Sequence, residues 1–362
     1  SECDELEAIN VYYAEGALAG ETRYFSDDGV LYFNNEDYVE DPATCEKTEL
    51  AYVPMAKTGT IYIPEGVEII PMGTLGSFDN GETSYKASHD FDKVVIPYTV
   101  TTIQEQAFVS NSKLTEITFL DAPDGVVAAD LTIGASAMAS CTKLTTINFP
   151  ARLKTFDAAI LEGCTKITAI NFSAGSADYL SQDGVVFSAN MKKLIYFPCG
   201  RAATDENPDL GKYTIPEKVE IIGSNAFSGA MITEVTIGKD VTTIEPYAFS
   251  GVSDKDGKSL SGIPGYFKGK YCSKLEKINF ADGNLPLSIG EGAFSGSAGE
   301  LTEVTLPRNL TYLGKFAFMG RTKIKTVNID LDPYYAAGTE IKYEESAFAW
   351  STANLTPSVE VV

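Results

Sequence analysis

Short runs of apolar residues alternate with single polar residues along most of the chain, and they recur at similar offsets. Seven segments share one form, in which three apolar positions are spaced by polar ones: 112–120, 142–150, 165–173, 230–238, 273–281, 300–308 and 322–330. In one of them, Leu144, Ile147 and Phe149 are separated by three and then two positions. Because side chains alternate along a strand, Ile147 and Phe149 face one side and Asn148 the other. The pattern predicts a short strand entered from a bend.

A second form alternates with the first and ends in Ala followed by an aromatic or aliphatic residue. It occurs at 101–108, 131–138, 220–227, 242–249, 287–294, 311–318 and, more loosely, 341–348. The Ala–apolar pair returns after about 22 to 30 residues, with longer gaps where something is inserted. Periods of this size are typical of solenoids, in which each unit buries its apolar face against its neighbours. The pair predicts one short turn, with its large side chain in the core and Ala leaving room for the next coil.

A larger duplication overlies these repeats. The matching segments are 24–35 with 179–190, 48–56 with 192–200, and 62–75 with 214–227. Asp28-Gly29 and Asp183-Gly184 lie between extended runs, which predicts tight turns with positive φ. We therefore expect a β-hairpin in each copy, and we expect the first to cover the N-terminal edge of the stack.

The repeated unit resembles the BspA-like leucine-rich repeats, which are usually found on the surface of bacteria and are often called adhesion-like. The resemblance rests on IGEGAF (289–294), CTKLTTINFP (141–150) and TIPEKVEIIGSNAF (214–227), and it covers roughly residues 60–350. Thr74-Leu75 and Ile160-Leu161 depart from the Ala–Phe pattern. The resemblance implies a curved, right-handed solenoid. With the residue patterns above, we expect a β-rich repeat solenoid of the α/β type with parallel strands, short helical turns and two inserted β-hairpins.

These patterns divide the chain into three parts. They are an acidic N-terminal cap with a β-hairpin at 1–59, the leucine-rich-repeat solenoid at 60–350, and a C-terminal tail at 351–362. Within the solenoid we expect a hairpin insert at 179–200 and a loop insert at 252–271.

Charge narrows the range of partners. The formal net charge is −22, and residues 1–59 alone hold fourteen acidic against three basic residues. Nucleic acid and anionic membranes carry the same sign, so we expect neither as a partner. No apolar run reaches the about 18 residues that a membrane span needs. The chain starts SECDELEAIN, without Met or a signal-peptide pattern, so we expect a mature or trimmed chain of an exported, cell-surface or extracellular protein.

The chain offers no convincing catalytic or metal-binding constellation. The one histidine, His89, lies in a polar connector, and we expect it to be exposed. Glu116, Glu234 and Glu303 occupy the same strand position in three repeats rather than two sides of a cleft. Close cysteine pairs and complete calcium loops are absent from the sequence. We expect no enzyme activity, no cofactor and no metal ion.

One cysteine position recurs just before the strand form. Its occupants are Cys141, Cys164 and Cys272 in three repeats, and Asn111, Ala230 and Arg321 in others. This exchange predicts a buried ladder position with free thiols rather than a metal site. Cys3 and Cys45 flank the acidic segment and could pair in an exported protein, whereas Cys199 aligns with Met55 and fills space.

Two surfaces are candidates for binding. The first is a row of short polar side chains at the outward middle position of the strands: Thr118, Asn148, Asn171, Thr236, Asn279, Thr305 and Asn328. Alternatively, these are ordinary solvent-facing strand residues without a binding role. The second is the loop insert, where Tyr266, Phe267 and Tyr271 lie beside Lys268. Its alternative is a loop packed down by its own aromatic rings.

We therefore expect a non-enzymatic leucine-rich-repeat protein that binds a protein or glycan. The alternative is a structural spacer that holds another domain away from the cell surface. Uncovered aromatic side chains on the folded surface would favour binding, and uniform polarity would favour the spacer.

Overall fold

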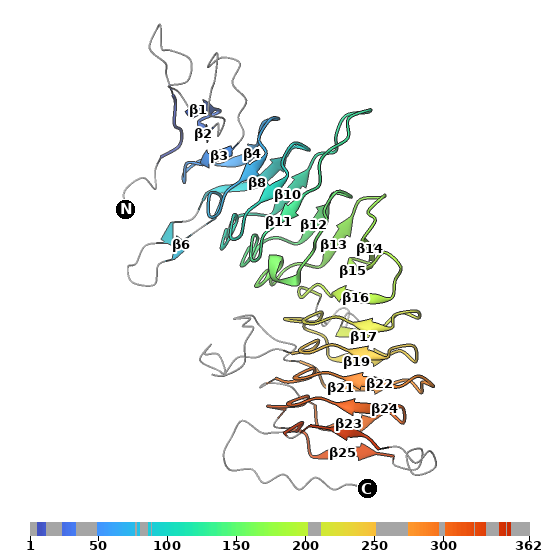
Figure 1. The fold of residues 1–362 in the computed structure, drawn as a ribbon. Helices are drawn as coiled ribbons and strands as arrows, with labels where there is room; N and C mark the ends of the chain where they lie inside the picture. The colour runs from blue at the N-terminus through green and yellow to red at the C-terminus, as the bar shows by residue number, and fades with distance from the viewer. Residues whose placement is uncertain are drawn as a thin grey trace. The chain divides into compact units, whose positions relative to one another are not determined.

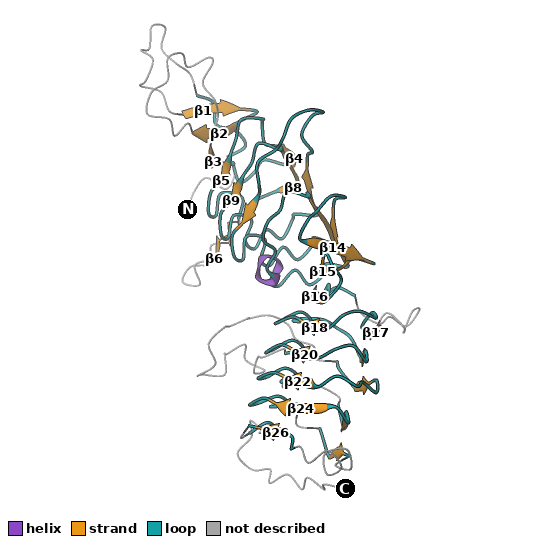
Figure 2. Ribbon diagram, turned by 45° about the vertical axis from the view of Figure 1, so that its right-hand side comes forward, coloured by secondary structure: helices purple, strands orange, loops and turns teal. Residues whose placement is uncertain are grey.

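The fold consists of short strands joined by tight turns (Figures 1 and 2). The computed structural model describes residues 6–11, 24–33, 49–76, 78–79, 86–87, 89–201, 211–250, 274–296, 301–321, 323–330, 340–344 and 346–348. The chain divides into two compact units. The N-terminal unit is Ser1–Lys166 with Phe172–Ala177, and the C-terminal unit is Ile167–Asn171 with Asp178–Val362.

In the N-terminal unit, successive coils supply one strand to each of two parallel ladders. One ladder is β4 (Gly59–Tyr62), β8 (Phe91–Ile96) and β10 (Glu116–Phe119). The other is β5 (Ile69–Ile70), β9 (Thr102–Ile103) and β11 (Thr132–Ile133). The unit also contains β12 (Thr146–Phe149) and the antiparallel pair β6 (Phe78–Asp79) and β7 (Lys86–Ala87). Inward residues such as Ile61 and Val94 are fully buried, as the strand pattern predicts.

The C-terminal unit repeats this plan. Its first ladder contains β17 (Lys212–Thr214), β19 (Glu234–Ile237) and β21 (Lys277–Phe280), and β23 (Glu303–Leu306) pairs in parallel with β25 (Thr326–Ile329). Its second ladder contains β18 (Ile221–Ile222), β20 (Thr243–Ile244), β22 (Leu287–Ile289), β24 (Leu310–Leu313) and β26 (Lys342–Tyr343). The division between the units falls within β13 (Ala169–Phe172). Figure 2 shows the strands of the second ladder at successive levels.

Each unit begins with an antiparallel meander of three strands. They are β1 (Tyr24–Asp27), β2 (Val30–Phe33) and β3 (Glu49–Tyr52) in one, and β14 (Tyr179–Gln182), β15 (Val185–Ser188) and β16 (Lys193–Tyr196) in the other. The predicted tight turns lie at the first strand junctions, where Asp28 and Asp183 have φ of 47° and 52°. The third strand of each meander then pairs in parallel with the first coil, β3 with β5 and β16 with β18.

The Ala–apolar pairs lie in turns whose backbone differs from the predicted helical turns. The residue before Ala has φ between 55° and 67° in all seven second-form segments: Gln106, Ser136, Asn225, Tyr247, Gly292, Phe316 and Ser346. A left-handed residue cannot continue a right-handed helix, so the expectation of helical turns was wrong for these coils. Among the residues described, the only helix is the 3₁₀ helix η1 (Ala158–Leu161), in a coil that lacks the Ala–Phe pair.

A ladder of backbone hydrogen bonds runs through the Ala–Phe pairs. The N–H of the Phe after Ala donates to the carbonyl of Ala in the next coil at 2.7–2.8 Å, for example from Phe108 to Ala137 and from Phe249 to Ala293. In the C-terminal unit the rings form a stack: Phe197, Phe227, Phe249, Phe294, Phe318 and Phe348. Adjacent centroids are 4.4–5.2 Å apart, and the planes are inclined by 4–21°. Phe197 belongs to the meander, so the ring stack joins the meander to the coils.

The side chain at the recurrent cysteine position donates to a backbone carbonyl in four coils. Asn111 Nδ2 donates to Leu75 O at 3.2 Å, Cys141 Sγ to Phe108 O at 3.2 Å, Cys164 Sγ to Met138 O at 3.0 Å and Arg321 Nε to Phe294 O at 2.7 Å. In each case the acceptor is the carbonyl of the residue that follows Ala one coil earlier, or of its counterpart where that coil lacks Ala. Cys141, Cys164 and Cys199 are buried, and none of the three forms a disulfide. Cys3, Cys45 and Cys272 lie outside the described residues.

Candidate functional site

The outward side of the first ladder in the C-terminal unit carries two polar rows. In β17, β19 and β21, Thr214, Thr236 and Asn279 are in register, and Lys212, Glu234 and Lys277 form a parallel row two residues earlier. In β23 and β25, Thr305 is in register with Asn328, and Glu303 with Thr326. Of the predicted Thr and Asn residues, Thr236 thus lies beside Asn279, and Thr305 beside Asn328. We call these two rows the strand face.

One hydrogen-bond arrangement occurs twice on the strand face. Asn279 Nδ2 donates to Glu234 Oε1 at 2.6 Å and contacts Thr236 Oγ1 at 3.4 Å. Asn328 Nδ2 donates in the same way to Glu303 Oε1, and to Thr305 Oγ1 at 3.2 Å. An amide has one donor group and one acceptor oxygen, so each Asn has its donor group engaged by its neighbours and its Oδ1 left as an acceptor.

The corresponding surface of the N-terminal unit is partly charged. Thr118 Oγ1 donates to Glu116 Oε1 at 3.1 Å, and Lys93 Nζ lies 3.1 Å from Glu116 Oε2. The hydrogen bond from Lys93 is the main reason why the pKa of Glu116 is lowered. Of the other predicted residues, Asn148 is exposed and Asn171 is half-buried.

Sequence reasoning missed one exposed aromatic residue on this surface. Tyr62 is 68% exposed and lies at the outward position of β4, in register with Val95 and, through β8, with Thr118. Extending the alignment of outward strand positions back to 62 and 95 would have found it. Tyr24 and Tyr343 are also exposed, at 52% and 77%.

The loop-insert candidates Tyr266, Phe267, Lys268 and Tyr271 lie outside the described residues. The structure therefore brings together the Thr and Asn candidates of neighbouring strands and leaves the insert as a prediction.

His89 is buried, so the expectation of an exposed histidine was wrong. Its side chain is 1% exposed, and Nε2 lies 3.0 Å from the carbonyl oxygen of Val53. The next residue, Asp90, donates its N–H to Met55 O. Burial lowers the pKa of His89, which outweighs the opposing effect of its backbone hydrogen bonds. The connector that looked polar is held against the segment that follows β3.

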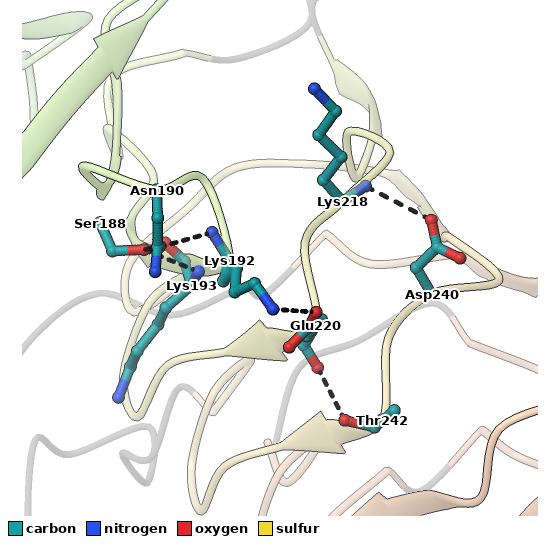
Figure 3. A network of polar contacts seen from close by, with 8 residues as sticks. All are labelled: Ser188, Asn190, Lys192, Lys193, Lys218, Glu220, Asp240 and Thr242. Atoms are coloured by element: carbon teal, nitrogen blue, oxygen red, sulfur yellow. Dashed lines mark hydrogen bonds and ion pairs between the residues drawn. The ribbon is translucent and has the colours of Figure 1, made fainter.

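A separate polar network joins the second meander to the first coils of the C-terminal unit (Figure 3). Lys192 Nζ donates to Glu220 Oε1 at 2.6 Å, and Thr242 Oγ1 donates to the main-chain oxygen of Glu220 at 3.3 Å. Lys193, the first residue of β16, has its Nζ 2.7 Å from Glu245 Oε1. These bonds connect one coil to the next, so we interpret the network as structural.

The described part of the chain has neither a metal-holding cluster nor a membrane-spanning helix. Within it, no group of three or more His, Cys, Asp or Glu side chains is arranged to hold a metal ion. None of its helices is long and apolar enough to cross a membrane.

Comparison with protein families identifies the repeat. The family model described as "BspA type Leucine rich repeat region" matches residues 80–198, 200–256 and 265–353, in six copies. The chain belongs to the BspA-type leucine-rich repeat family. The BspA-type match thus includes coils of both units, and β4 and β5 precede its first residue. A comparison with curated protein sequences finds no match.

Several crystal structures match this BspA-type chain over most of its length. The pneumococcal vaccine antigen PcpA is 16% identical with a TM-score of 0.49, and the match covers 86% of this chain and 82% of PcpA. A leucine rich cell surface protein from Faecalibacterium prausnitzii is 17% identical with a TM-score of 0.36, over 92% and 99% of the two chains. A leucine-rich repeat protein from Bacteroides ovatus is 17% identical with a TM-score of 0.29, over 85% and 88%.

Proposed function

We propose that this protein is a non-enzymatic, adhesion-like binding protein, exported and displayed at the bacterial cell surface, that recognises a protein or glycan through the strand face. Membership of the BspA-type family supports a binding role. The strong negative charge argues against nucleic acid as the ligand, since both would carry the same sign.

The observation that carries the proposal is the repeated Asn–Glu–Thr arrangement. Asn279 and Asn328 are each fixed by a Glu and a Thr of the preceding strand, so their Oδ1 atoms have a defined position before any ligand arrives. Fixing side chains in advance reduces the entropy lost on binding. A row of fixed acceptors suits a ligand rich in donors, such as sugar hydroxyls or the amides and cationic side chains of a protein.

Exposed aromatic residues favour binding over the spacer alternative. Tyr62 is 68% exposed on the outward side of β4, beside the Lys93–Glu116 ion pair. Aromatic rings with a polar group nearby are enriched at contact surfaces because they combine apolar area with hydrogen bonding. A surface that only had to separate other domains has no need of such a residue.

The loop insert 252–271 is a second proposed contact site. Its aromatic residues and lysines can stack on a sugar ring or meet acidic groups of a protein. Tyr266→Ala combined with Phe267→Ala should weaken binding by about one to a few kcal/mol without changing the melting temperature. An early-melting double variant would instead mean that the rings pack within the fold.

A glycan array and an array of host surface proteins, probed with the full chain, test the proposal. Asn279→Ala combined with Asn328→Ala should reduce the signal of the bound ligand at least about tenfold, the effect expected of central contact residues. Thr243→Ala combined with Ser288→Ala is the matched control, because these residues face outward from the second ladder. Equal loss in both variants, or a chain that binds nothing on either array, would contradict recognition through the strand face.

A further inference from the structure

One connection in the N-terminal unit is much longer than its counterparts. Residues 120–130 join β10 to the buried Leu131, eleven residues in all, and we call this segment the β10 loop. The same junction takes three residues in other coils, Pro97–Thr99 after β8 and Pro150–Arg152 after β12. Figure 1 shows the connection after β10 reaching farther from the ladder than its neighbours.

The base of the β10 loop is anchored to neighbouring coils. Arg152 Nη1 donates to Val100 O at 2.6 Å and to Ala129 O at 3.3 Å, so one guanidinium binds the loop and the coil before it. Lys154 Nζ forms an ion pair with Asp130 at 3.4 Å. Within the loop, Val126 N–H donates to Pro123 O at 3.0 Å. These bonds give the loop a defined conformation, which limits the entropy a partner would have to remove.

The tip of this anchored loop is apolar and exposed. Val127 is 95% exposed and Val126 47%, and Leu120, at the base of the loop, is 43% exposed. Single exposed aliphatic residues are common on protein surfaces, but Val126 and Val127 are adjacent residues in one anchored loop. These side chains contribute nothing to the core, so the stability of the fold does not account for them.

The surroundings of the tip determine what it can bind. In the β10 loop Asp124 lies two residues before Val126, whereas Asp130 pairs with Lys154 and Asp121 interacts with Arg152. The N-terminal unit as a whole has 27 acidic against 10 basic residues. Negative charge beside an apolar tip favours a partner with the opposite sign around an apolar side chain. The aliphatic tip lacks an aromatic face on which a sugar ring could stack, which argues for a polypeptide.

We propose that the β10 loop is a docking site for a polypeptide segment that presents an aliphatic or aromatic side chain flanked by Lys or Arg. This site is separate from the strand face and does not depend on the function proposed above. Val126 and Val127 would supply the apolar contact, and Asp124 would supply the charge that speeds association.

Synthetic peptides test the site on the full chain. One peptide alternates Leu with Lys, a second Leu with Glu, and a third Ser with Lys, and affinity is measured by biolayer interferometry. The wild-type chain should bind the Leu/Lys peptide at least about tenfold more tightly than the other two. Val126→Ser combined with Val127→Ser should remove that preference, and Asp124→Asn should slow association and weaken its salt dependence.

A matched control lies in the C-terminal unit. Leu285 is 50% exposed in the six-residue connection that follows β21, and Leu285→Ser should bind the Leu/Lys peptide like the wild-type chain. Melting temperatures should be equal in all variants, because the exchanged side chains are exposed. Any of three results would overturn the proposal. They are equal binding of both Lys peptides, no binding of the Leu/Lys peptide, and full affinity in the Val126/Val127 variant.

Discussion

The rings of Phe227 and Phe249 lie 4.4 Å apart in consecutive coils, with their planes inclined by only 15°. Phe249 stacks equally on Phe294 in the next coil, at 4.8 Å and 9°. Its ring therefore has an aromatic neighbour on both faces and is fully buried. Each such pair is worth about 0.5–1.5 kcal/mol beyond the area it buries.

Phe249→Leu should lower the free energy of unfolding by about 1–3 kcal/mol, because it removes two ring–ring contacts while keeping an apolar side chain. The measurement is chemical denaturation followed by circular dichroism. Met138→Leu is the control, since Met138 holds the same position in the N-terminal unit and the exchange preserves volume. It should cost less than about 1.5 kcal/mol. If both variants lost the same free energy of unfolding, ring stacking would add no stability beyond that of burying the side chain.

The ladder thiols should be free and replaceable. Cys164 Sγ donates to Met138 O at 3.0 Å, and contact with Cys141 together with burial raises the pKa of its thiol, which keeps the donor hydrogen in place at neutral pH. Cys164→Ala should cost about 1–2 kcal/mol, mainly for the carbonyl left without this donor. Thiol titration after denaturation without reductant should find at least Cys141, Cys164 and Cys272, and Cys199 in addition. Finding them in disulfides or bound to zinc would refute the ladder role.

Replacing the left-handed residue before Ala by Gly should show how much backbone strain that position carries. Gln106 is exposed with φ of 57°, a conformation that costs a non-glycine residue about 1–2 kcal/mol. Gln106→Gly should therefore stabilise the chain by about 0.5–1 kcal/mol, after allowing for the entropy that Gly adds to the unfolded state. Thermal melts would show the gain, and a lower melting temperature would contradict it.

Gly292 occupies the same backbone position in a crowded setting. A β-carbon there would lie 2.5 Å from Cε1 of Tyr247 in the preceding coil. Gly292→Val should cost about 2 kcal/mol or more, since it combines left-handed strain with this overlap. Gly125→Ala is the comparison, because Gly125 also has positive φ but open space around it. The alanine variant should lose only about 1 kcal/mol.

Protonation of His89 should destabilise the N-terminal unit. Burial lowers its folded-state pKa below 6.5, so the folded protein favours the neutral ring. As pH falls below the unfolded-state pKa of about 6.5, the unfolded state takes up a proton that the folded state resists, and stability decreases until pH reaches the lowered folded-state pKa. Denaturation at about pH 7.5 and pH 5.5 should show this loss. His89→Gln, which keeps a donor but does not titrate, should show less of it.

Residues 1–59 should act as a cap. β3 pairs with β5, and Leu50 and Val53 are fully buried. Deleting the segment should uncover Ile61, Val67 and the edge of β5, and so promote association of the chain. Light scattering and thermal melts would reveal it. A truncated protein that remains monomeric with an unchanged melting temperature would show that the segment is an independent appendage.

The repeats made the ladder positions predictable, because several aligned copies reveal which offsets are apolar. Ile147 and Phe149 point inward and Asn148 outward, as the strand pattern requires. The left-handed position was not predictable, since Gln, Ser, Asn, Tyr, Gly and Phe all occupy it. Its conformation is imposed by the coil-to-coil backbone bonds, which leave no signature in residue type.

His89 and Tyr62 show two further limits. His89 occurs once, so no aligned copy revealed its environment, and its burial depends on Val53 in a segment 36 residues away. Tyr62 was predictable in principle, because it occupies an outward strand position. Its strand precedes the seven segments that share the strand form, so their common pattern does not include it. Contacts between distant segments are thus the part of the site that local patterns do not specify.

The bond from each coil's Phe N–H to the next coil's Ala carbonyl also has a mechanical consequence. Every rung connects only two neighbouring coils, so pulling on the end of the C-terminal unit loads its rungs one after another. A coil can detach while those behind it stay bonded, and the ring left at the new end is still stacked on its other side. Tension would therefore be released in steps of one coil, with the remaining coils intact.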